Sequence, residues 1–319
     1  MGDRRSGDLL PLVKSTAPGK IILFGEHAVV YNRPALAVPV NQVQAEVAVE
    51  ESDQPGVWIN APDIDLHSDL SSLPHDHPIG SVILKVFRLF DIFHRPDMTV
   101  TVRSTIPVAS GLGSGAAVSA ALVRALAEFL GQPMTNEQVN AVVFEIEKIH
   151  HGTPSGIDNT VITYNMPVYY TREQPIETFK CGKPFTIVIG DTGISAPTKE
   201  SVGDVRRLWL RNTSYIEEIF DEIAQIALIA RRSIESGHPE LLGELMEHNH
   251  QYLQQLSVSS PELDVLVAAA QRAGALGAKL SGGGRGGNMI ALVDPASAES
   301  VAAALMSAGA KRTIITEIR

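Results

Sequence analysis

The side chains best suited to chemistry are two carboxylates, Glu147 and Asp158, and they occur among three glycine-rich stretches. The first stretch, P-V-A-S-G-L-G-S-G-A-A, runs from Pro107 to Ala117, between an expected strand and an expected helix. Glycines let backbone N–H groups approach an oxyanion, and a helix start adds free N–H groups and a positive dipole end. We expect a phosphate cradle, with an ordinary glycine turn as the alternative. The stretch matches neither G-x-x-x-x-G-K-[ST] nor G-x-G-x-x-G, so those nucleotide folds are not supported.

Glu147 is the first of the two carboxylates. It lies four residues after Val143 and one after Ile146, inside the apolar stripe of an expected helix, so we expect its side chain to face inward. A buried carboxylate needs a cation, a metal ion or hydrogen bonds, because an unpaired charge in apolar surroundings is costly. A functional carboxylate and a structural ion pair with a core lysine or arginine are therefore the two interpretations.

The second carboxylate, Asp158, belongs to T-P-S-G-I-D-N, Thr153 to Asn159, where proline and glycine predict a rigid turn. Rigid turns hold functional side chains well, although aspartate and asparagine are common in turns for local reasons. The third stretch, K-L-S-G-G-G-R-G-G-N, runs from Lys279 to Asn288 and has five glycines in six residues. We expect close backbone approach to a ligand there, and a flexible hinge is the alternative.

The N-terminal stretch A-P-G-K-I-I-L-F-G-E-H-A-V-V, Ala17 to Val30, predicts a strand that carries Lys20 and then a turn at Gly25. In order and spacing, the four segments together resemble the motifs of the small-metabolite kinases named after galactose, homoserine, mevalonate and phosphomevalonate (GHMP kinases). The resemblance covers almost the whole chain. H-G-x-P-S-G-I-D-N, from His151, is the form most specific for the mevalonate branch, whereas the galactokinase branch usually has arginine at the position of Lys20.

The resemblance implies ATP-dependent phosphorylation of the primary hydroxyl of mevalonate, giving mevalonate 5-phosphate and ADP in isoprenoid biosynthesis, with Mg²⁺ as cofactor. It makes Asp158 the catalytic acid–base group and Lys20 its cationic neighbour. It makes Glu147 and Ser114 the ligands of Mg²⁺. The family often has two serines in this loop, whereas this chain has Ser114 followed by Gly115, so Ser114 is the hydroxyl assigned to the metal. The implied nucleotide contacts are Pro107, Val108, Ala109, Ser110, Gly111, Leu112, Gly113, Ser114, Gly115, Ala116 and Ala117. The implied acceptor contacts are Lys20, Glu26, His27, Asp158, Thr198 and Gly283.

These residue types suit the reaction. Phosphoryl transfer needs mainly positioning and charge neutralisation, which Mg²⁺, cradle N–H groups and a cation supply. Asp158 is able to accept the proton of the primary hydroxyl, and a neighbouring Lys20 favours its ionised form.

Composition restricts the partners and the compartment. A net charge of -10 and a pI near 5.5 argue against nucleic acid or an anionic membrane as the main partner. The single cysteine, Cys181, allows no intrachain disulfide framework and no cysteine-based zinc cluster, which fits a reducing cytoplasm. We find no signal-peptide stretch and no run of about 18 apolar residues. The expected partners are small molecules, and a homodimer is compatible with the sequence.

Periodicity and composition predict the helices and strands that carry these residues. Alternation predicts strands over 43–49 and 98–102, composition predicts strands over 161–170 and 185–189, and strands also follow over 288–293 and 313–318. Helical spacing and stop signals predict helices over 116–130, from 135 to about 150, and over 206–236, 241–256, 262–273 and 296–308. The elements mix without strict alternation, so the expected class is α+β. The resemblance implies two lobes, a kinase lobe over 1–180 and a ferredoxin-like α+β lobe over 181–319, with both substrates in the cleft between them.

Three rival functions differ in the residues they require. A phosphomevalonate-phosphorylating sibling needs extra cations near the acceptor, for which Lys199 and Arg285 are candidates. A mevalonate-type decarboxylase phosphorylates before it eliminates carboxylate, and retention of Lys20, Glu147 and Asp158 at the spacing of the mevalonate branch favours the simple kinase. A non-catalytic nucleotide-binding protein predicts damage to the acid or the lysine, and both are present.

Overall fold

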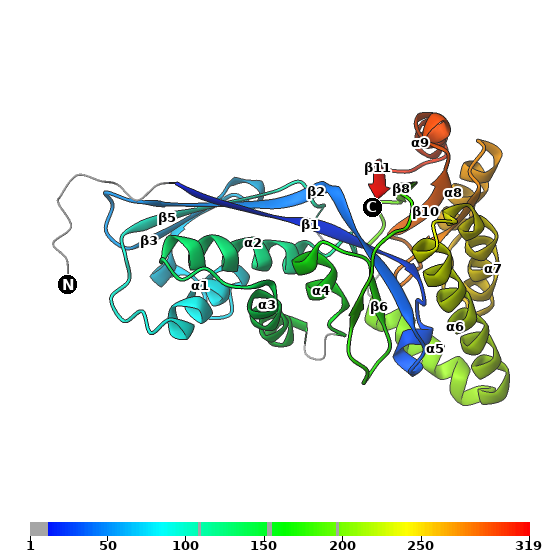
Figure 1. The fold of residues 1–319 in the computed structure, drawn as a ribbon, viewed down its shortest axis with the longest axis horizontal. Coiled ribbons are helices and arrows are strands. Elements are labelled where there is room, and N and C mark those ends of the chain that lie inside the picture. Colours follow the sequence, from blue (N-terminus) through cyan, green and yellow to red (C-terminus); the bar gives the residue numbers. More distant parts are fainter. Residues whose placement is uncertain (1–11, 108–109, 152–154, 196–197) are drawn as a thin grey trace. The chain divides into compact units, whose positions relative to one another are not determined.

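The computed structural model describes residues 12–107, 110–151, 155–195 and 198–319, which form a mixed α+β fold (Figure 1). The chain divides into two compact units that interleave along the sequence. Unit 1 contains the chain up to Pro18, Val43–Ile106 and Ser114–Pro154, and unit 2 contains Gly19–Gln42, Pro107–Gly113 and Ser155–Arg319. The expected α+β class is confirmed, and the lobe boundary between residues 180 and 181 stays a prediction.

Unit 1 contains a sheet with helices packed on it. The C-terminal part of β2 (Ala35–Glu51) pairs antiparallel with β5 (Met98–Ser104), β5 pairs parallel with β3 (Val57–Ala61), and β3 pairs antiparallel with β4 (Leu66–Asp69). Helices α1 (Pro78–Leu89), α2 (Ser114–Phe129) and α3 (Asn136–His151) lie along one side of these strands (Figure 1). The alternation predicted for 43–49 is confirmed, because Val43, Ala45, Val47 and Val49 are all buried.

The start of α3 has the reciprocal capping that its sequence predicts. The Thr135 backbone N–H donates to Gln138 Oε1 at 2.8 Å, and the Gln138 N–H donates to Thr135 Oγ1 at 3.4 Å. Such a capping box satisfies two N–H groups that a helix start would leave without partners. The cap stabilises the start of α3, the helix that carries Glu147.

Unit 2 begins with the part of β1 (Val13–Phe24) that follows Gly19, and the N-terminal part of β2 pairs antiparallel with β6 (Val168–Tyr170), which pairs with β7 (Glu177–Thr178). A second, antiparallel sheet has the order β11 (Arg312–Ile318), β8 (Phe185–Asp191), β10 (Asn288–Val293) and β9 (Gly277–Ser281). The helices of this unit are α4 (Ile157–Tyr164), α5 (Thr198–Arg211), α6 (Thr213–Glu235), α7 (Leu242–Gln255), α8 (Pro261–Arg272) and α9 (Ala298–Ser307).

The core of unit 2 lies between the second sheet and its helices, where fully buried side chains include Val188, Phe220, Leu253, Leu280 and Met289. Helices α7 and α8 both pack on β9, and α6 packs on α7 (Figure 1). Short 3-10 helices complete the described fold, at Ala28–Tyr31 (η1), Pro62–Ile64 (η2), Leu70–Ser72 (η3), Pro239–Leu241 (η4) and Pro295–Ser297 (η5).

Three expectations about these elements were wrong. The strand predicted over 161–170 is mostly helix, because α4 extends to Tyr164 and only β6 is a strand. Asp158 accordingly lies in the first turn of α4 and not in a turn between elements. The helix predicted over 206–236 is two helices, which are interrupted at Asn212, where φ is -148° and ψ is 73°.

Candidate active site

Lys20 and Asp158 form an ion pair within unit 2. Lys20 Nζ lies 3.1 Å from Asp158 Oδ1, and the side chains are 8% and 37% exposed respectively. Lys20 comes from β1, and Asp158 comes from the first turn of α4. The residues that the sequence assigned as acid and cation are therefore adjacent, with the lysine embedded in protein and one side of the carboxylate open to a ligand.

The local sequence explains how α4 presents Asp158. Gly156 caps the helix with φ at 90°, a conformation that suits glycine because it has no Cβ. Ile157 and Val161 bury one face of the helix against Ala35 and Val168. The Asp158 side chain is 37% exposed although Ile157 and Val161 on either side of it are buried, so its carboxylate reaches the surface of the helix.

The glycine loop lies beside the same lysine. The Lys20 backbone N–H donates to Leu112 O at 2.9 Å. Gly113 has φ at 77°, and a Cβ on it would lie 2.8 Å from Ile162 Cδ1 and 2.9 Å from Lys20 Cγ. Only glycine fits this close approach. Among the expected nucleotide contacts, Val108 and Ala109 lie outside the described residues.

The two expected Mg²⁺ ligands both belong to unit 1. Ser114 is the first residue of α2, and Glu147 lies on α3 with 9% of its surface exposed, which confirms its inward orientation. A Cβ built on Gly115 would lie 3.7 Å from Glu147 Oε1. The carboxylate therefore lies over the first turn of α2, where a hydroxyl and a carboxylate oxygen suit a hard cation.

Glu26 forms a buried ion pair with Lys279 of β9. The two side chains are 1% and 0% exposed, and Lys279 Nζ donates both to Glu26 Oε1 and, at 2.6 Å, to Leu280 O. Burial raises the pKa of Glu26, and the charge of Lys279 opposes that shift. Glu26 Oε2 is buried and has no hydrogen-bond partner in the described part of the chain, so it remains available to a ligand or a water molecule.

His27 is the neighbouring buried polar residue. Its Nε2 lies 3.1 Å from Gly283 O, and because a carbonyl only accepts, Nε2 carries the proton. The pKa of His27 is lowered to about 4, chiefly by burial and also by the nearby charges of Arg285 and Lys279, while the hydrogen bond to Gly283 opposes the shift. The ring is neutral at pH 7, and Nδ1, for which the described residues provide no partner, is an acceptor. His27 has φ at 62°, an uncommon backbone conformation for this residue type.

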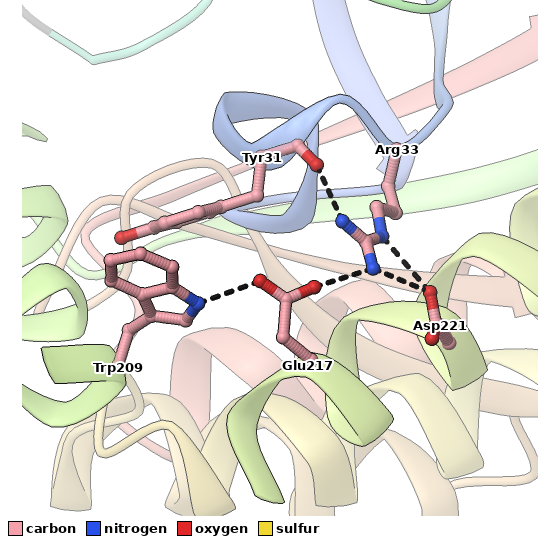
Figure 2. A network of polar contacts seen from close by, with 5 residues as sticks. All are labelled: Tyr31, Arg33, Trp209, Glu217 and Asp221. Atoms are coloured by element: carbon pink, nitrogen blue, oxygen red, sulfur yellow. Dashed lines mark hydrogen bonds and ion pairs between the residues drawn. The ribbon is translucent and has the colours of Figure 1, made fainter. Parts of the chain in front are cut away.

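Arg33, which follows Glu26 and His27 in the chain, forms hydrogen bonds with two acidic residues of α6 (Figure 2). The Arg33 guanidinium donates to Glu217 Oε2 at 2.5 Å and, through two nitrogens, to Asp221 Oδ1 at 3.0 and 2.7 Å. Glu217 Oε1 accepts the Trp209 indole N–H at 2.7 Å, so Glu217 connects Arg33 with α5 as well. Tyr31 stacks on Phe220 with ring centroids 4.4 Å apart, which adds apolar contact to this polar network.

The third glycine-rich stretch lines a pocket with the glycine loop and β1. The lining residues are Lys20, Ile21, Ile22, Ser110, Gly111, Ile194, Ser281, Gly282, Gly283, Gly284, Gly286, Gly287 and Asn288. A Cβ on Gly284 would lie 1.9 Å from Val258 O, so the stretch is packed tightly against its neighbours at this position. Arg285 donates to the carboxylate of Asp204 on α5 and, at 3.4 Å, to Ser257 O.

The structure brings some of the residues expected to contact the acceptor into contact with one another. Lys20 and Asp158 are adjacent to each other, and His27 is bonded to Gly283. Thr198 is the first residue of α5, but the side chains of Thr198 and Lys199 lie outside the described residues. The assignment of all these residues to ATP, metal or acceptor stays a prediction.

Lys279 and Asn288 are buried polar residues beside this site for which the sequence predicted no role. Lys279 is fully buried, and Asn288 is 3% exposed and donates from Nδ2 to Ser110 O at 2.6 Å. Both stand at the ends of the third glycine-rich stretch. The signal for Lys279 was a lysine inside a short run of small and apolar residues, where an unpaired charge would be costly.

Two family models match the chain. The model of the GHMP kinases N terminal domain matches residues 79–165, and the model of the GHMP kinases C terminal region matches residues 230–311. The chain belongs to the GHMP kinase family.

Its relatives within that family include mevalonate kinases of two species. The mevalonate kinase of Thermococcus gammatolerans is 36% identical, over 96% of both chains. The mevalonate kinase of Pyrococcus abyssi is 36% identical over 93% of both chains.

Solved structures show the same fold. The mevalonate kinase of L. major in complex with R-mevalonate superposes with a TM-score of 0.85 at 28% identity, covering 96% of this chain and 95% of the other. The mevalonate kinase of methicillin-resistant Staphylococcus aureus MRSA252 has a TM-score of 0.74 at 31% identity, covering 95% and 98%. The expected GHMP kinase fold is therefore confirmed.

Proposed function

We propose that this chain phosphorylates the primary hydroxyl of mevalonate with ATP, giving mevalonate 5-phosphate and ADP in isoprenoid biosynthesis. The observation that carries the proposal is the Lys20–Asp158 ion pair, with Nζ and Oδ1 3.1 Å apart. Relatives 36% identical over nearly the whole chain are mevalonate kinases, which supports the choice of acceptor.

In the proposed reaction, Asp158 accepts the proton of the attacking hydroxyl, and the hydroxyl oxygen attacks the γ-phosphorus of ATP. Lys20 holds the carboxylate in place and stabilises negative charge on the transferred group. The N–H groups of the glycine loop, Ser110–Gly113, bind phosphate oxygens, for which closely approaching glycines are suited. Because phosphoryl transfer depends mainly on positioning and electrostatics, these groups account for the chemistry that the protein must supply.

We propose that Glu147 and Ser114 hold the Mg²⁺ ion that accompanies ATP. When bound, Mg²⁺ neutralises charge on the phosphate oxygens. The support is the carboxylate of Glu147 over the first turn of α2, together with the preference of Mg²⁺ for oxygen ligands. Within the described residues no three or more His, Cys, Asp or Glu side chains gather as a metal site. That result suits a Mg²⁺ ion held by one or two protein ligands and by substrate phosphates.

The acceptor is proposed to contact Glu26 and His27. Glu26 Oε2 and His27 Nδ1 are both hydrogen-bond acceptors without protein partners in the described part of the chain, so they suit a ligand that brings hydroxyl donors. Arg285, one of the cations that a phosphorylated acceptor would need, is already paired with Asp204. This pairing favours an unphosphorylated alcohol over the sibling reaction on phosphomevalonate.

We propose a cytoplasmic enzyme whose partners are its small-molecule substrates. The acidic composition, with a net charge of -10, and the single cysteine support this proposal. Among the described helices none is long and apolar enough to cross a bilayer. Homodimer formation stays a prediction.

The proposal is tested by ADP release with Mg-ATP and mevalonate, beside phosphomevalonate, homoserine and galactose, with mass analysis of the products. Turnover with mevalonate that yields mevalonate 5-phosphate and is lost in Asp158→Asn is the expected result. Turnover with only one of the other acceptors would be compatible with the GHMP kinase family but would show that mevalonate is not the acceptor.

A further inference from the structure

Asn288 connects the third glycine-rich stretch to the glycine loop. It is the first residue of β10 and follows Gly287 directly. Its Nδ2 donates to Ser110 O at 2.6 Å, across 178 residues of sequence, and a Cβ on Gly111 would lie 3.8 Å from the same nitrogen. The carboxamide therefore lies directly against the peptide bond between Ser110 and Gly111.

This contact sets the direction of one backbone donor. The described chain contains no cis peptide bond, and in a trans peptide the C=O and the following N–H point in opposite directions. Because Ser110 O points at Asn288, the Gly111 N–H points away from it. A free rotation of this peptide would turn the donor away from any ligand on the loop, and glycine permits such rotation easily.

The carbonyl of Leu112, two residues further along the loop, is also bound by the protein. Leu112 O accepts the Lys20 backbone N–H at 2.9 Å, so the Gly113 N–H points away from β1. Gly111 and Gly113 have φ at 78° and 77°. Two alternate carbonyls are thus bound by the protein, and the N–H group that follows each of them points away from that protein partner, which is an arrangement that suits an anion.

We propose that Asn288 is a positioning residue for the nucleotide phosphates. It acts through Ser110 O to hold the Gly111 N–H toward a phosphate oxygen. The inference rests on the proposed function, because it takes the glycine loop as the phosphate-binding loop. A second observation favours a ligand here: Asn288 lines the pocket beside Lys20 and Gly283, and its buried Oδ1 finds no partner among the described residues. If Asn288 served only the fold, both polar atoms of its carboxamide would be expected to have hydrogen-bond partners.

Three variants of Asn288 test the proposal by nucleotide binding, measured by titration calorimetry with Mg-ADP and Mg-ATP in the absence of acceptor. Asn288→Ala removes the donor, and loss of one hydrogen bond is expected to weaken nucleotide binding about tenfold. Asn288→Asp replaces the donor with a carboxylate oxygen, which repels Ser110 O and adds negative charge near the phosphates. A larger loss of nucleotide affinity is therefore expected. Asn288→Ser, which keeps a hydroxyl donor at smaller volume, should fall between wild type and Asn288→Ala and serves if the alanine variant folds poorly.

Steady-state kinetics separates positioning from general damage. The KM for ATP is expected to follow the binding constants, whereas the KM for the acceptor should change by less than about threefold, because Asn288 acts on the loop alone. Thr192→Val is the matched control. Thr192 Oγ1 donates to the neighbouring Gly287 O at 3.0 Å and accepts the Ile194 N–H at 3.2 Å, so this variant loses side-chain hydrogen bonds beside the same stretch while the bond from Asn288 to Ser110 O is kept.

Unchanged nucleotide binding in Asn288→Ala would overturn the inference. So would equal increases in the KM values for ATP and acceptor, or a loss in Thr192→Val as large as that in Asn288→Ala. The identity of the acceptor is tested separately. If nucleotide binding depends on Asn288 but the protein phosphorylates an alcohol other than mevalonate, the inference about Asn288 stands and the proposed acceptor is wrong. A wild-type protein that bound no nucleotide would overturn both.

Discussion

Lys20 Nζ lies 3.1 Å from Asp158 Oδ1, and the lysine side chain is 8% exposed while the aspartate side chain is 37% exposed. The cation is held by surrounding protein, and the carboxylate keeps an open side. This asymmetry suits a carboxylate that must accept a proton from a bound substrate while its charge partner stays in place.

The first prediction concerns this pair. Asp158→Asn keeps the size of the side chain and removes the proton acceptor, so kcat with mevalonate is expected to fall about 10²–10⁴-fold, with Mg-ATP affinity nearly unchanged. Lys20→Met is expected to lower kcat about 10²–10³-fold, because it removes a cation that stabilises the transferred group. Rapid-quench measurement of the chemical step checks both values. If Asp158→Asn kept more than a tenth of the wild-type rate, Asp158 would not be the base.

The second prediction concerns the proposed metal ligand. Glu147→Gln removes a charged ligand while keeping the side-chain volume, so the Mg²⁺ concentration for half-maximal activity is expected to rise at least about tenfold. Glu145→Gln is the control, because Glu145 lies one half-turn away on α3 and pairs at 2.8 Å with exposed Lys148. Titrations of activity with Mg²⁺ at saturating ATP give the comparison. Equal responses of the two variants would show that Glu147 has only a structural task.

The third prediction follows from the pKa of His27, which is about 4 in the folded protein against an ordinary 6.5. Between these values the unfolded chain binds a proton that the folded protein does not bind, so His27 lowers the stability of the fold as the pH falls from about 6.5 toward 4. The full difference corresponds to about 3 kcal/mol.

The matched variant for this measurement is His27→Gln, which has an amide donor for Gly283 O and no titrating group. Urea unfolding of both proteins at pH 7 and at pH 4.5 gives the free energies of unfolding. The wild-type protein is expected to lose more stability on acidification than the variant does. Parallel losses in the two proteins would contradict the assigned pKa.

The fourth prediction concerns the buried pair of Glu26 and Lys279, which are 1% and 0% exposed. Lys279→Met leaves an uncompensated carboxylate in the interior and is expected to cost about 3–5 kcal/mol in the free energy of unfolding. The double variant Glu26→Gln with Lys279→Met removes both charges, so most of this loss should be recovered. Urea unfolding of the two single variants and the double variant completes the cycle. Additive losses would mean that the two charges do not interact.

The double variant, Glu26→Gln with Lys279→Met, also distinguishes a role of Glu26 in stability from a role in acceptor binding. It lacks the Glu26 carboxylate, so its KM for mevalonate is expected to stay raised even where its stability approaches that of the wild type. A double variant with wild-type KM would show that Glu26 serves the fold and not the acceptor.

Most helices and strands were predicted from the sequence because caps and apolar periodicity involve residues that are close together in the chain. The capping box of Thr135 and Gln138 sets the start of α3, and the alternation from Val43 to Val49 gives one buried face of a strand. Helix α4 was missed for a physical reason. Thr160, Val161, Ile162 and Thr163 are β-branched and favour strands on their own, but in the fold Ile157 and Val161 pack against Ala35 and Ala37. Tertiary packing outweighs a weak local preference.

The motifs, the residue types for phosphoryl transfer and the family can be recognised in the amino-acid sequence, because they depend on residue identity and order along the chain. Which side chains meet depends on the tertiary structure. Lys279 reaches Glu26 across 253 residues of sequence, and Asn288 reaches Ser110 across 178. Contacts at such separations depend on the register of strands and the packing of helices, which no local pattern contains. The same packing buries His27 and keeps its ring neutral, a property that a histidine in the sequence does not reveal.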